Sequence, residues 1–497
     1  MRIPIDRENT TPIYRQVEQF IREGILSGSL AAEQRLPASR QLGADLGINR
    51  LTIEKAYGEL EAKGLIYTRI GSGTFVSAQH YTEENTQSEN GSISLPKWQD
   101  DLGQFMPLVL FKDEDELLLE MNHPDPISFS SGIGDANLFP VDEFRKVIHG
   151  VLKRDGMTAL DYGDKEGYLP LRQMIVQILG SQGLHTKVEH VMITAGSQQA
   201  ISLISQILLK PGDTVLVEKP TYSGALNLFR SIGVKIVSIP VDEKGMLVEQ
   251  LEDTLRAHRP QLIYTIPNFQ NPTGACMNGS RRRHLVALAD QYNVPILEDD
   301  FVGDLRYDGF ANPSLKALDS GGRVIYVSTF SKMLMPGLRM GYIVTEGPLF
   351  ERLVEWKVVN DLATSSLLQR ALESYVTVGR YQAHLRRATL MYGKRCEAMI
   401  KAIHNHLPVD IRFTRPQGGL FIWLQLPESI EAEELLAIAC QQGVGFTVGN
   451  QFFVDPDEGR HCLRLNFVAQ TPDRIELGII RLSESIQQVL HQKNGSY

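Results

Sequence analysis

From about Ile127 onward, short apolar runs alternate with stretches of helical periodicity, and this alternation restricts the possible folds most strongly. Strands that alternate with helices build a mostly parallel sheet covered on both faces. The predicted strands span residues 191–194, 214–218, 235–239, 262–266, 295–299 and 324–328. Ligands of such sheets bind at the carboxyl ends of the strands. We therefore expect an α/β domain over residues 126–490, with its functional site at the strand ends.

The length of 497 residues exceeds what one core holds and suggests roughly three units at about 150 residues each. The net charge of −9 excludes a polycation, so nucleic acid would have to bind through a local patch. The four cysteines have no metal-type spacing and indicate reduced thiols, so no metal site is expected. The N-terminus lacks the apolar run of a signal peptide, and no run reaches the ~18 residues of a membrane span. We expect a cytoplasmic protein without a membrane partner.

Residues 1–78 show a separate pattern of three helices and a hairpin. Helical patterns span residues 13–25, 39–46 and 50–63, and short strands span 65–70 and 74–76. Ser39 is the expected N-cap of the second helix, and Gly47-Ile48-Asn49 forms the turn before the third. Two helices joined by a three-residue turn and followed by a hairpin form a winged helix-turn-helix. This segment is predicted to bind double-stranded DNA.

The third helix is the expected recognition helix, which enters the major groove with its N-terminal residues. The candidate DNA-contacting residues lie at the starts of the second and third helices and in the wing: Arg40, Asn49, Arg50, Thr52, Arg69, Gly71 and Gly73. Acidic and basic residues nearly balance here, and Glu54 lies on the recognition helix. A helical protein-interaction module is the alternative interpretation.

Residues 79–125 are predicted to be a linker. The segment 82–92 is polar and acidic and offers little to bury, which is typical of a flexible tether. Residues 97–125 contain scattered apolar residues and a possible short helix at 113–121. We expect this second part to pack on the large domain.

The segment Val327–Tyr342, after the last predicted strand, carries the strongest chemical signal. Lys332 offers an amine for a Schiff base with an aldehyde cofactor, and Thr329, Ser331 and Arg339 offer donors to a phosphate. The alternative is a surface lysine in an ordinary loop.

Four other strand ends carry candidate residues. Gly196 and Ser197 open a helix whose N-terminus favours an anion, although Ser197 could be only an N-cap. Tyr222 could stack on a planar ring or simply pack in the core. Asn271 could contact a ring oxygen, although Asn-Pro also marks turns. Asp299 could pair with a ring nitrogen and raise its pKa, or serve as a cap or metal ligand.

Together these motifs resemble the fold type I pyridoxal 5′-phosphate (PLP) enzymes of aminotransferase class I/II, from about Ser128 to Ser485. The resemblance implies a mostly parallel large domain and a smaller C-terminal α+β subdomain. It implies Lys332, Asp299 and Tyr222 as catalytic residues, with Lys332 forming the internal aldimine. The implied cofactor-binding residues also include Asn271, Gly196, Ser197, Gln198, Thr329, Ser331, Arg339 and, lent to a dimer neighbour, Tyr162.

Arg464 matches the family's arginine for a substrate α-carboxylate, with a surface strand arginine as the alternative. One departure is Phe301, which stands where many relatives carry a tyrosine that bonds the ring hydroxyl. Asn271 would then make that bond alone.

Residues 36–76 resemble the GntR-type winged helix, on Leu36-Pro37-Ala38-Ser39-Arg40, Leu46–Ile53 and Gly71–Val76. A GntR-like module joined to an aminotransferase-like domain is similar to the MocR/GabR family of transcription regulators. That resemblance implies a head-to-tail homodimer that binds promoter DNA and senses an amino compound, or PLP itself, through aldimine chemistry at Lys332. The alternative is a working aminotransferase with an appended DNA-binding module. Ser223 follows Tyr222, where the GABA-responsive member has an arginine, which disfavours GABA as the effector.

Overall fold

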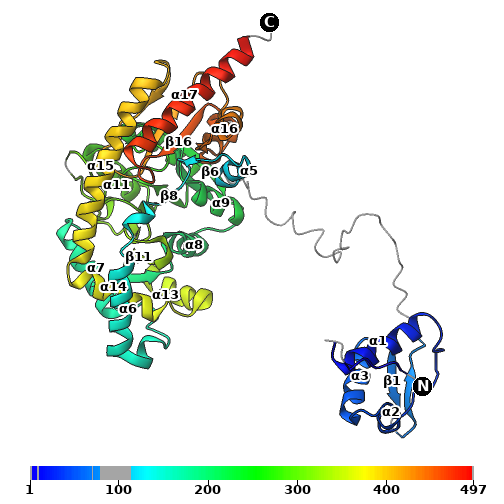
Figure 1. Ribbon diagram of the computed structural model, residues 1–497. Helices are drawn as coiled ribbons and strands as arrows, with labels where there is room; N and C mark the ends of the chain where they lie inside the picture. The colour runs from blue at the N-terminus through cyan, green and yellow to red at the C-terminus, as the bar shows by residue number, and fades with distance from the viewer. Residues whose placement is uncertain (1–2, 8–10, 70, 79–113, 310, 495–497) are drawn as a thin grey trace. The chain divides into compact units, whose positions relative to one another are not determined.

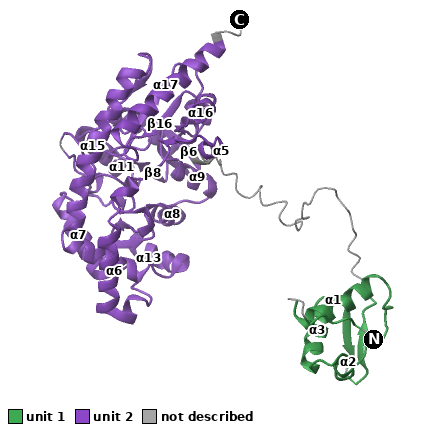
Figure 2. Cartoon of the chain, in the orientation of Figure 1, with its two compact units in different colours: residues 1–100 green, residues 101–497 purple. Residues whose placement is uncertain are grey.

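The computed structural model describes residues 3–7, 11–69, 71–78, 114–309 and 311–494. The chain divides into two units, residues 1–100 and 101–497 (Figure 2), and each is described by itself below. Along the described residues, none of the helices combines the length and the apolar character that a bilayer crossing requires. The predicted linker lies mostly outside the described residues. Its described end contains helix α5 (Glu114–Glu120), whose Leu118 is buried in the core of the large unit.

The small unit is a winged helix-turn-helix, as predicted. Its elements are α1 (Ile13–Leu26), α2 (Ser39–Leu46), α3 (Arg50–Ala62), β1 (Ile66–Arg69) and β2 (Gly73–Val76). The three helices pack around side chains at helical spacing: Val17, Ile21, Ile25, Leu42, Ile53, Ala56 and Leu60. Gly47 ends α2 with φ +62°, a left-handed conformation that suits glycine and turns the chain toward α3.

The prediction for Ser39 is wrong. Ala38 is the N-cap of α2, and Ser39 is already the first helical residue. The Ser39 hydroxyl instead donates to Glu54 Oε1 on α3, at 3.2 Å. A serine before an apolar helical pattern does not reveal whether its hydroxyl finds the helix backbone or a neighbouring helix.

The large unit is built on an eight-stranded sheet with the order β4-β11-β10-β9-β8-β5-β6-β7. Its strands are β4 (Val191–Thr194), β5 (Thr214–Lys219), β6 (Lys235–Asp242), β7 (Gly245–Met246), β8 (Leu262–Thr265), β9 (Ile296–Asp300), β10 (Val324–Thr329) and β11 (Gly341–Val344). The strands from β6 to β10 in this order pair in parallel, and β11 and β7 run antiparallel to their neighbours. The mostly parallel sheet and the α/β class are therefore confirmed.

Side chains alternate between the two faces of this sheet and supply two cores. On β8, Leu262 and Tyr264 enter the larger core, and Ile263 between them enters the smaller one. The helices that surround the sheet (Figure 1) are α6 (Val141–Asp155), α7 (Leu169–Ser181), α8 (Ser197–Leu208), α9 (Ser223–Ile232), α10 (Leu251–His258), α11 (Gly279–Gln291), α12 (Leu315–Leu318), α13 (Pro348–Asp361) and α14 (Ser366–Thr377). The alternation along each strand places Tyr264 on the same side as the functional residues described below.

The C-terminal part forms the expected smaller α+β layer. Long helices α15 (Arg380–His406) and α17 (Pro472–Asn494) pack along each other beside α16 (Ala432–Gln441) (Figure 1). A second sheet has the order β12-β13-β16-β15, from Arg412–Phe413, Phe421–Gln425, Cys462–Asn466 and Thr447–Val448. A short parallel pair joins β3 (Ile127–Ser128) to β14 (Val444–Gly445). Strand β16 brings Arg464 to the large sheet's strand ends.

Candidate functional site

Six of the predicted site residues line one cavity of about 240 Å³ in the large unit: Ser197, Tyr222, Asn271, Asp299, Lys332 and Arg464. Gly196, Gln198, Ser331 and Arg339 are not among its lining residues, and Thr329 lines a second cavity. The walls of the first cavity come from both sheets and from helix starts: Gly132, Ser197, Tyr222, Ser223, Ile266, Asn271, Asp299, Phe301, Lys332, Phe421, Gln451 and Arg464. The carboxyl ends of parallel strands meet at one edge of a sheet, which explains why residues far apart in sequence converge here.

Lys332 lies in this cavity, in the connection between β10 and β11. Burial, with the guanidinium groups of Arg464 and Arg339 adding to it, lowers the pKa of Lys332 to about 8. A Cβ atom on Gly132 would lie 3.8 Å from the Lys332 amine, so glycine leaves the approach to this nitrogen open. An amine that is partly neutral near pH 8 is suited to attack a carbonyl carbon.

Asp299 lies buried at the end of β9, and one of its oxygens is available to a ligand. Oδ2 accepts a hydrogen bond of 2.8 Å from the Tyr264 hydroxyl. Oδ1 is buried and has no hydrogen-bond partner among the described residues. Burial raises the pKa of Asp299 to about 7. A donor or cation that reached Oδ1 would stabilise the charged carboxylate.

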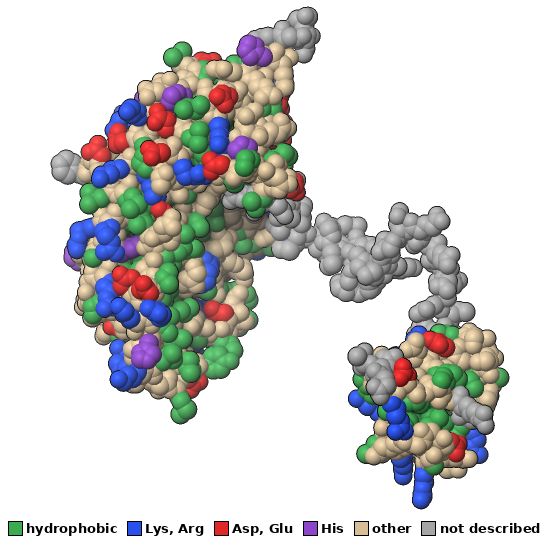
Figure 3. Space-filling view, in the orientation of Figure 1, with side chains coloured by type: hydrophobic (Ala, Val, Ile, Leu, Met, Phe, Trp, Pro, Cys, Tyr) green, Lys and Arg blue, Asp and Glu red, His purple; other side chains and the backbone are tan. Residues whose placement is uncertain are grey.

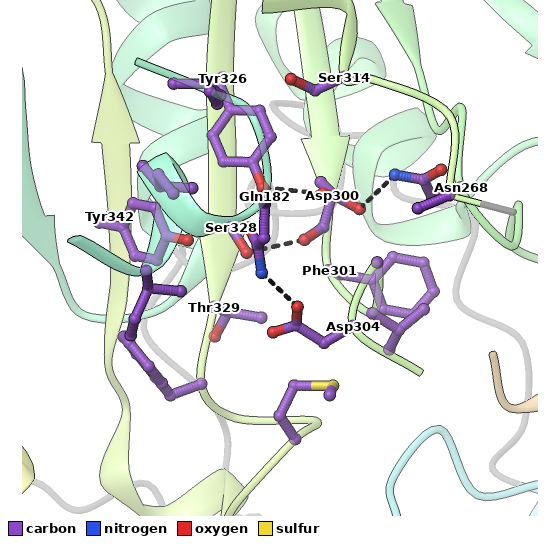
Figure 4. Close-up of a pocket in the computed structure, with 18 of the residues that line it drawn as sticks. Gln182, Asn268, Asp300, Phe301, Asp304, Ser314, Tyr326, Ser328, Thr329 and Tyr342 are labelled. Atoms are coloured by element: carbon purple, nitrogen blue, oxygen red, sulfur yellow. Dashed lines mark hydrogen bonds between the residues drawn. The ribbon is translucent and has the colours of Figure 1, made fainter. Parts of the chain in front are cut away.

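Three consecutive acids end strand β9, and each has a different set of partners. Glu298 accepts from the backbone N–H groups of Leu315 and Lys316, and burial raises its pKa to about 7. Asp300 points away from the Lys332 cavity. Its two oxygens accept hydrogen bonds from Asn268 Nδ2 and from the Tyr326 hydroxyl (Figure 4). Only Asp299 of the three lines the Lys332 cavity.

The cavity that Asp300 enters is a second one, of about 310 Å³, and Figure 4 shows its lining. Gln182 donates to Asp304 there, and burial raises the pKa of Asp304 to about 6. Phe301 lines both cavities and is 7% exposed. Its ring offers no hydroxyl to the Lys332 cavity, in keeping with the departure noted from the sequence.

The turn from β4 into α8 forms an anion-binding arrangement. Gly196 has φ +95°, and no side chain caps the first turn of α8, so its backbone N–H groups point outward. Arg339 Nη2 donates to the Ala195 carbonyl at 3.0 Å, and a Cβ on Gly196 would lie only 2.8 Å from that nitrogen. Glycine is therefore required for the close approach of the guanidinium.

The two predicted hydroxyls beside Lys332 differ. The Ser331 hydroxyl is buried and has no partner among the described residues. The Thr329 hydroxyl donates to the Met340 carbonyl at 3.0 Å and accepts from the Ser331 N–H. A hydroxyl has one proton to donate. In this arrangement Ser331, and not Thr329, has a proton to offer to an anion.

Tyr222 and Gln198 hold each other at the cavity wall. The Tyr222 hydroxyl donates to Gln198 Oε1 at 3.2 Å, and Gln198 Nε2 donates to the Gly224 carbonyl. Burial raises the pKa of Tyr222. Gln198 thus orients the tyrosine ring, and both ends of its side-chain amide are engaged in hydrogen bonds.

Arg464 is 7% exposed and lies inside the cavity, which excludes the interpretation of a surface strand arginine. Its two terminal nitrogens donate to Asn271 Oδ1 at 3.0 Å, to the Ser130 carbonyl at 2.8 Å and to the Thr447 hydroxyl at 3.2 Å. The Phe421 ring lies 4.1 Å from the guanidinium carbon. A buried arginine held between oxygens and an aromatic face is suited to bind a carboxylate.

Tyr162 lies outside this cavity and is 79% exposed. It lines a shallow surface pocket with Leu160, Ser365 and Ser366. The structure therefore does not bring Tyr162 to the Lys332 cavity of its own chain.

Sequence reasoning missed several residues of the site. Tyr264 was counted only as a strand residue, although its alternation with Ile263 places it on the face of Asp299. Phe421, Gln451, Ser130 and Thr447 come from segments without a recognisable motif. Their roles depend on how the second sheet meets the first, which no local pattern shows.

In the small unit, the predicted DNA-contacting residues Asn49 and Arg50 make hydrogen bonds within their own helix. The Asn49 side chain accepts from the Leu51 N–H at 2.9 Å and so caps α3. Arg50 Nε donates to Glu54 Oε1 at 2.7 Å, one helical turn along. To contact DNA, Arg50 must therefore exchange Glu54 for a phosphate or a base. The Asn49 side chain is already engaged as the N-cap of α3.

The other predicted contacts lie on the outside of the unit. Arg40 and Arg69 are exposed, and basic side chains project from the visible face (Figure 3). Arg69 stacks over Tyr67 and lies 3.9 Å from Glu33. Thr52 is half-buried in the first turn of α3.

The wing glycines differ from each other. A Cβ on Gly71 would meet nothing within 4 Å, whereas a Cβ on Gly73 would lie 2.8 Å from Arg35 Nε. Gly71 at the wing tip is thus open to a partner, and Gly73 is packed against its own unit.

The Lys332 cavity fits a phosphorylated pyridine aldehyde. A partly neutral amine and a carboxylate oxygen without a partner belong to residues that line the cavity, and next to Lys332 in the chain the buried Ser331 hydroxyl has no partner among the described residues. These groups match an aldehyde, a ring nitrogen and a phosphate respectively.

Comparisons with known proteins agree with this geometry. The family described as "Aminotransferase class I and II" matches residues 125–480, and "Bacterial regulatory proteins, gntR family" matches residues 13–76. The HTH-type transcriptional regulator YdfD of Bacillus subtilis, named as uncharacterized, is 32% identical over 478 residues, or 96% of this chain and 97% of YdfD. The probable rhizopine catabolism regulatory protein MocR of Rhizobium meliloti is 31% identical over 91% of this chain and 90% of MocR.

Among solved structures, LysN, the α-aminoadipate aminotransferase of Thermus thermophilus complexed with N-(5′-phosphopyridoxyl)-L-leucine, matches with a TM-score of 0.74 and 32% identity. The match covers 80% of this chain and 100% of LysN. The relatives named as regulators, in contrast, match over nearly their full length, with the winged helix included. The chain therefore belongs to the MocR/GabR family, in which a gntR-type winged helix is joined to a class I/II aminotransferase domain whose cofactor is pyridoxal 5′-phosphate.

Proposed function

We propose that this protein is a DNA-binding transcription regulator whose large unit holds PLP and responds to a small amino compound or to PLP itself. The observation that carries the proposal is the convergence of Lys332, Asp299 and Arg464 on one cavity, in a chain that also carries a winged helix. The full-length relatives named above bear the names of regulators.

When bound, PLP supplies an electrophilic aldehyde carbon and an electron-withdrawing ring. Lys332 would be the amine that holds it, and Asp299 would be the carboxylate for its ring nitrogen. Tyr222 would stack on the ring, and Asn271 would contact the ring hydroxyl, because Phe301 has no hydroxyl to offer. The N-terminus of α8, with Gly196, Ser197, Ser331 and Arg339, would bind the phosphate, and Gln198 and Thr329 would position their neighbours.

Arg464 is the group that recognises an effector carboxylate. One of its nitrogens is bonded to Asn271 Oδ1. A carboxylate that takes this nitrogen in a bidentate pair removes a partner from Asn271, which also lines the cavity. Effector binding is thereby coupled to the ring contacts of the cofactor, and differential affinity of two states for the effector shifts their populations.

A head-to-tail homodimer is part of the proposal. Tyr162 is 79% exposed, and its neighbours Leu160 and Met157 are 69% and 87% exposed. An exposed cluster of large apolar side chains favours a protein partner. In the dimer, Tyr162 would reach the phosphate of the neighbouring cavity, and the winged helices would bind promoter DNA as a pair.

A working aminotransferase remains the second candidate. It is favoured by the relatives of the large unit that are named aminotransferases, among them LysN, and by the buried Lys332 amine in the cavity, whose lowered pKa suits it to transfer protons near pH 8.

One experiment separates the two candidates. The full-length protein is loaded with PLP and mixed with single amino acids, with and without a 2-oxo acid, while visible absorbance and affinity for its own upstream DNA are followed. A regulator shows one spectral change per protein and altered DNA affinity. Repeated turnover with unaltered DNA affinity would establish the enzyme instead.

A further inference from the structure

Helix α13 carries an ion pair between a buried lysine and a partly exposed aspartate, and the functions above do not use it. Lys357 is 1% exposed, and its amine donates to Asp361 Oδ1 at 2.9 Å, one turn along the helix. Burying a lysine is costly unless its charge is paired and its amine is hydrogen-bonded. The partner Asp361 ends the helix, where a negative charge faces the helix dipole unfavourably.

The pair is connected to the phosphate turn by one side chain. Gln199 Nε2 donates to Asp361 Oδ2 at 2.9 Å. Oε1 of the same amide accepts from the Ala195 N–H at 2.7 Å. The Ala195 carbonyl in turn accepts from Arg339. The charge pair, the amide and the turn thus form one continuous set of hydrogen bonds.

Helix α13 packs against α8, and the two lie side by side in Figure 1. A second polar contact joins them farther along, where Trp356 Nε1 donates to Gln206 at 2.9 Å. The Asp361 carboxylate is therefore held at the N-terminal end of α8, which is also the end that offers its N–H groups to an anion.

We propose that Lys357 and Asp361 are positioning residues for the cofactor phosphate. Asp361 orients Gln199 and thereby the Ala195–Ser197 turn, and Lys357 neutralises Asp361 so that no net negative charge lies beside the phosphate. The inference rests on the proposed phosphate site.

The charge of Asp361 affects a bound phosphate as well as the hydrogen bond that Asp361 accepts from Gln199. A lone carboxylate one amide away from the anion site would repel a dianionic phosphate, because the Asp361 side chain is only 24% exposed and water screens its charge incompletely. With Lys357 in place, the pair presents its hydrogen-bonding geometry without its charge. Removing the lysine therefore harms phosphate binding, whereas removing both charges does not.

The test compares PLP with pyridoxal, which lacks the phosphate. Dissociation constants of both are measured on the full-length apoprotein by titrating visible absorbance. In Lys357→Met, the preference for PLP over pyridoxal should fall by about tenfold or more. In the double variant Lys357→Met/Asp361→Asn, it should return to within about threefold of wild type.

Two control variants are measured in the same way, one expected to have no effect and one expected to lower the preference. Arg352→Met removes an exposed ion pair with Glu355 on the same helix and should leave the preference unchanged. Arg339→Ala removes a proposed phosphate residue and should lower the preference. If Arg339→Ala has no effect, the proposed phosphate site is wrong, and this inference falls with it. If Arg339→Ala lowers the preference and Lys357→Met does not, only the inference is overturned.

A purely structural role for the pair makes a different prediction. It would weaken PLP and pyridoxal alike, and the double variant would remain as weak as the single one; either result overturns the inference. If Lys357→Met does not fold, Asp361→Asn decides, because it keeps the lysine and removes the negative charge. It should preserve or increase the preference for PLP, and a decrease would refute the charge argument.

Discussion

Replacing Asp299 by asparagine should have opposite effects on the apoprotein and on the PLP-bound protein. Asp299 is buried, and burial raises its pKa from 3.8 to about 7. The folded chain therefore holds a proton in this window that the unfolded chain has released. The contribution of this group to the free energy of unfolding falls as the pH rises from about 4 to about 7, and it stays low above pH 7.

The size of the effect follows from the pKa difference. At 1.36 kcal/mol per pKa unit, the charged Asp299 costs the apoprotein about 4 kcal/mol at pH 8. Asparagine has a similar shape, and its amide oxygen can still accept from Tyr264. Asp299→Asn should therefore stabilise the apoprotein at pH 8 by up to about 4 kcal/mol and change little at pH 4. With PLP bound, the neutral amide forms no ion pair with the ring nitrogen, so the same variant should bind PLP more weakly.

The assay is urea unfolding of the large unit at pH 4 and pH 8, with and without PLP, followed by tryptophan fluorescence. Trp356 and Trp423 lie in the large unit, and the third tryptophan, Trp98, belongs to the predicted linker. All proteins compared therefore carry Trp98→Phe, so that the signal reports the large unit. The reasoning would be refuted if Asp299→Asn destabilised the apoprotein at pH 8 as much as at pH 4. Unchanged PLP affinity in the variant would separately remove Asp299 from the ring nitrogen.

Three further outcomes are expected. Lys332→Ala should lose the visible band and the borohydride-fixed adduct while far-UV circular dichroism is unchanged; a persisting adduct would place the reactive amine elsewhere. Arg464→Lys should weaken the binding of an effector that has a carboxylate by roughly 2–3 kcal/mol, because the bidentate geometry is lost. The binding of an amine without a carboxylate should be unchanged, and titration measures both. Arg50→Ala should weaken DNA binding by roughly 1–3 kcal/mol if it reads a base, whereas Glu54→Gln, which releases Arg50, should strengthen it; gel shifts at two salt concentrations test both, and a weaker complex in Glu54→Gln would contradict the competition.

The parts of the fold that could be predicted are those with local signals. Apolar runs marked six strands of the large sheet, and β4, β8 and β10 are buried along their whole length. The strand ends then located Lys332, Asp299 and Asn271 together. Strand β11 was not predicted, because Gly341–Val344 is short and follows directly on a glycine and proline turn. Its place in the sheet depends on pairing with β4 and β10, which are far away in sequence.

The parts of the site that could not be predicted depend on which partner a polar group finds. The sequence offers Thr329 and Ser331 as equal hydroxyls, yet the Met340 carbonyl takes the proton of Thr329. Asn49 and Ser39 could each cap a helix or face outward, and one caps whereas the other bonds Glu54. Such choices are settled by distances of a few ångströms between separate elements.

The three acids at the end of β9 affect how readily the protein without its cofactor unfolds, and therefore how fast it is degraded. Glu298 and Asp299 cannot share a partner, since neighbouring strand residues face opposite ways, and each is forced toward its neutral form by burial. A positively charged ring at the middle acid offsets part of that cost, so the vitamin-loaded chain opens less often than the bare one. Proteases act on opened chains. A shortage of vitamin B6 would then lower the number of regulator molecules.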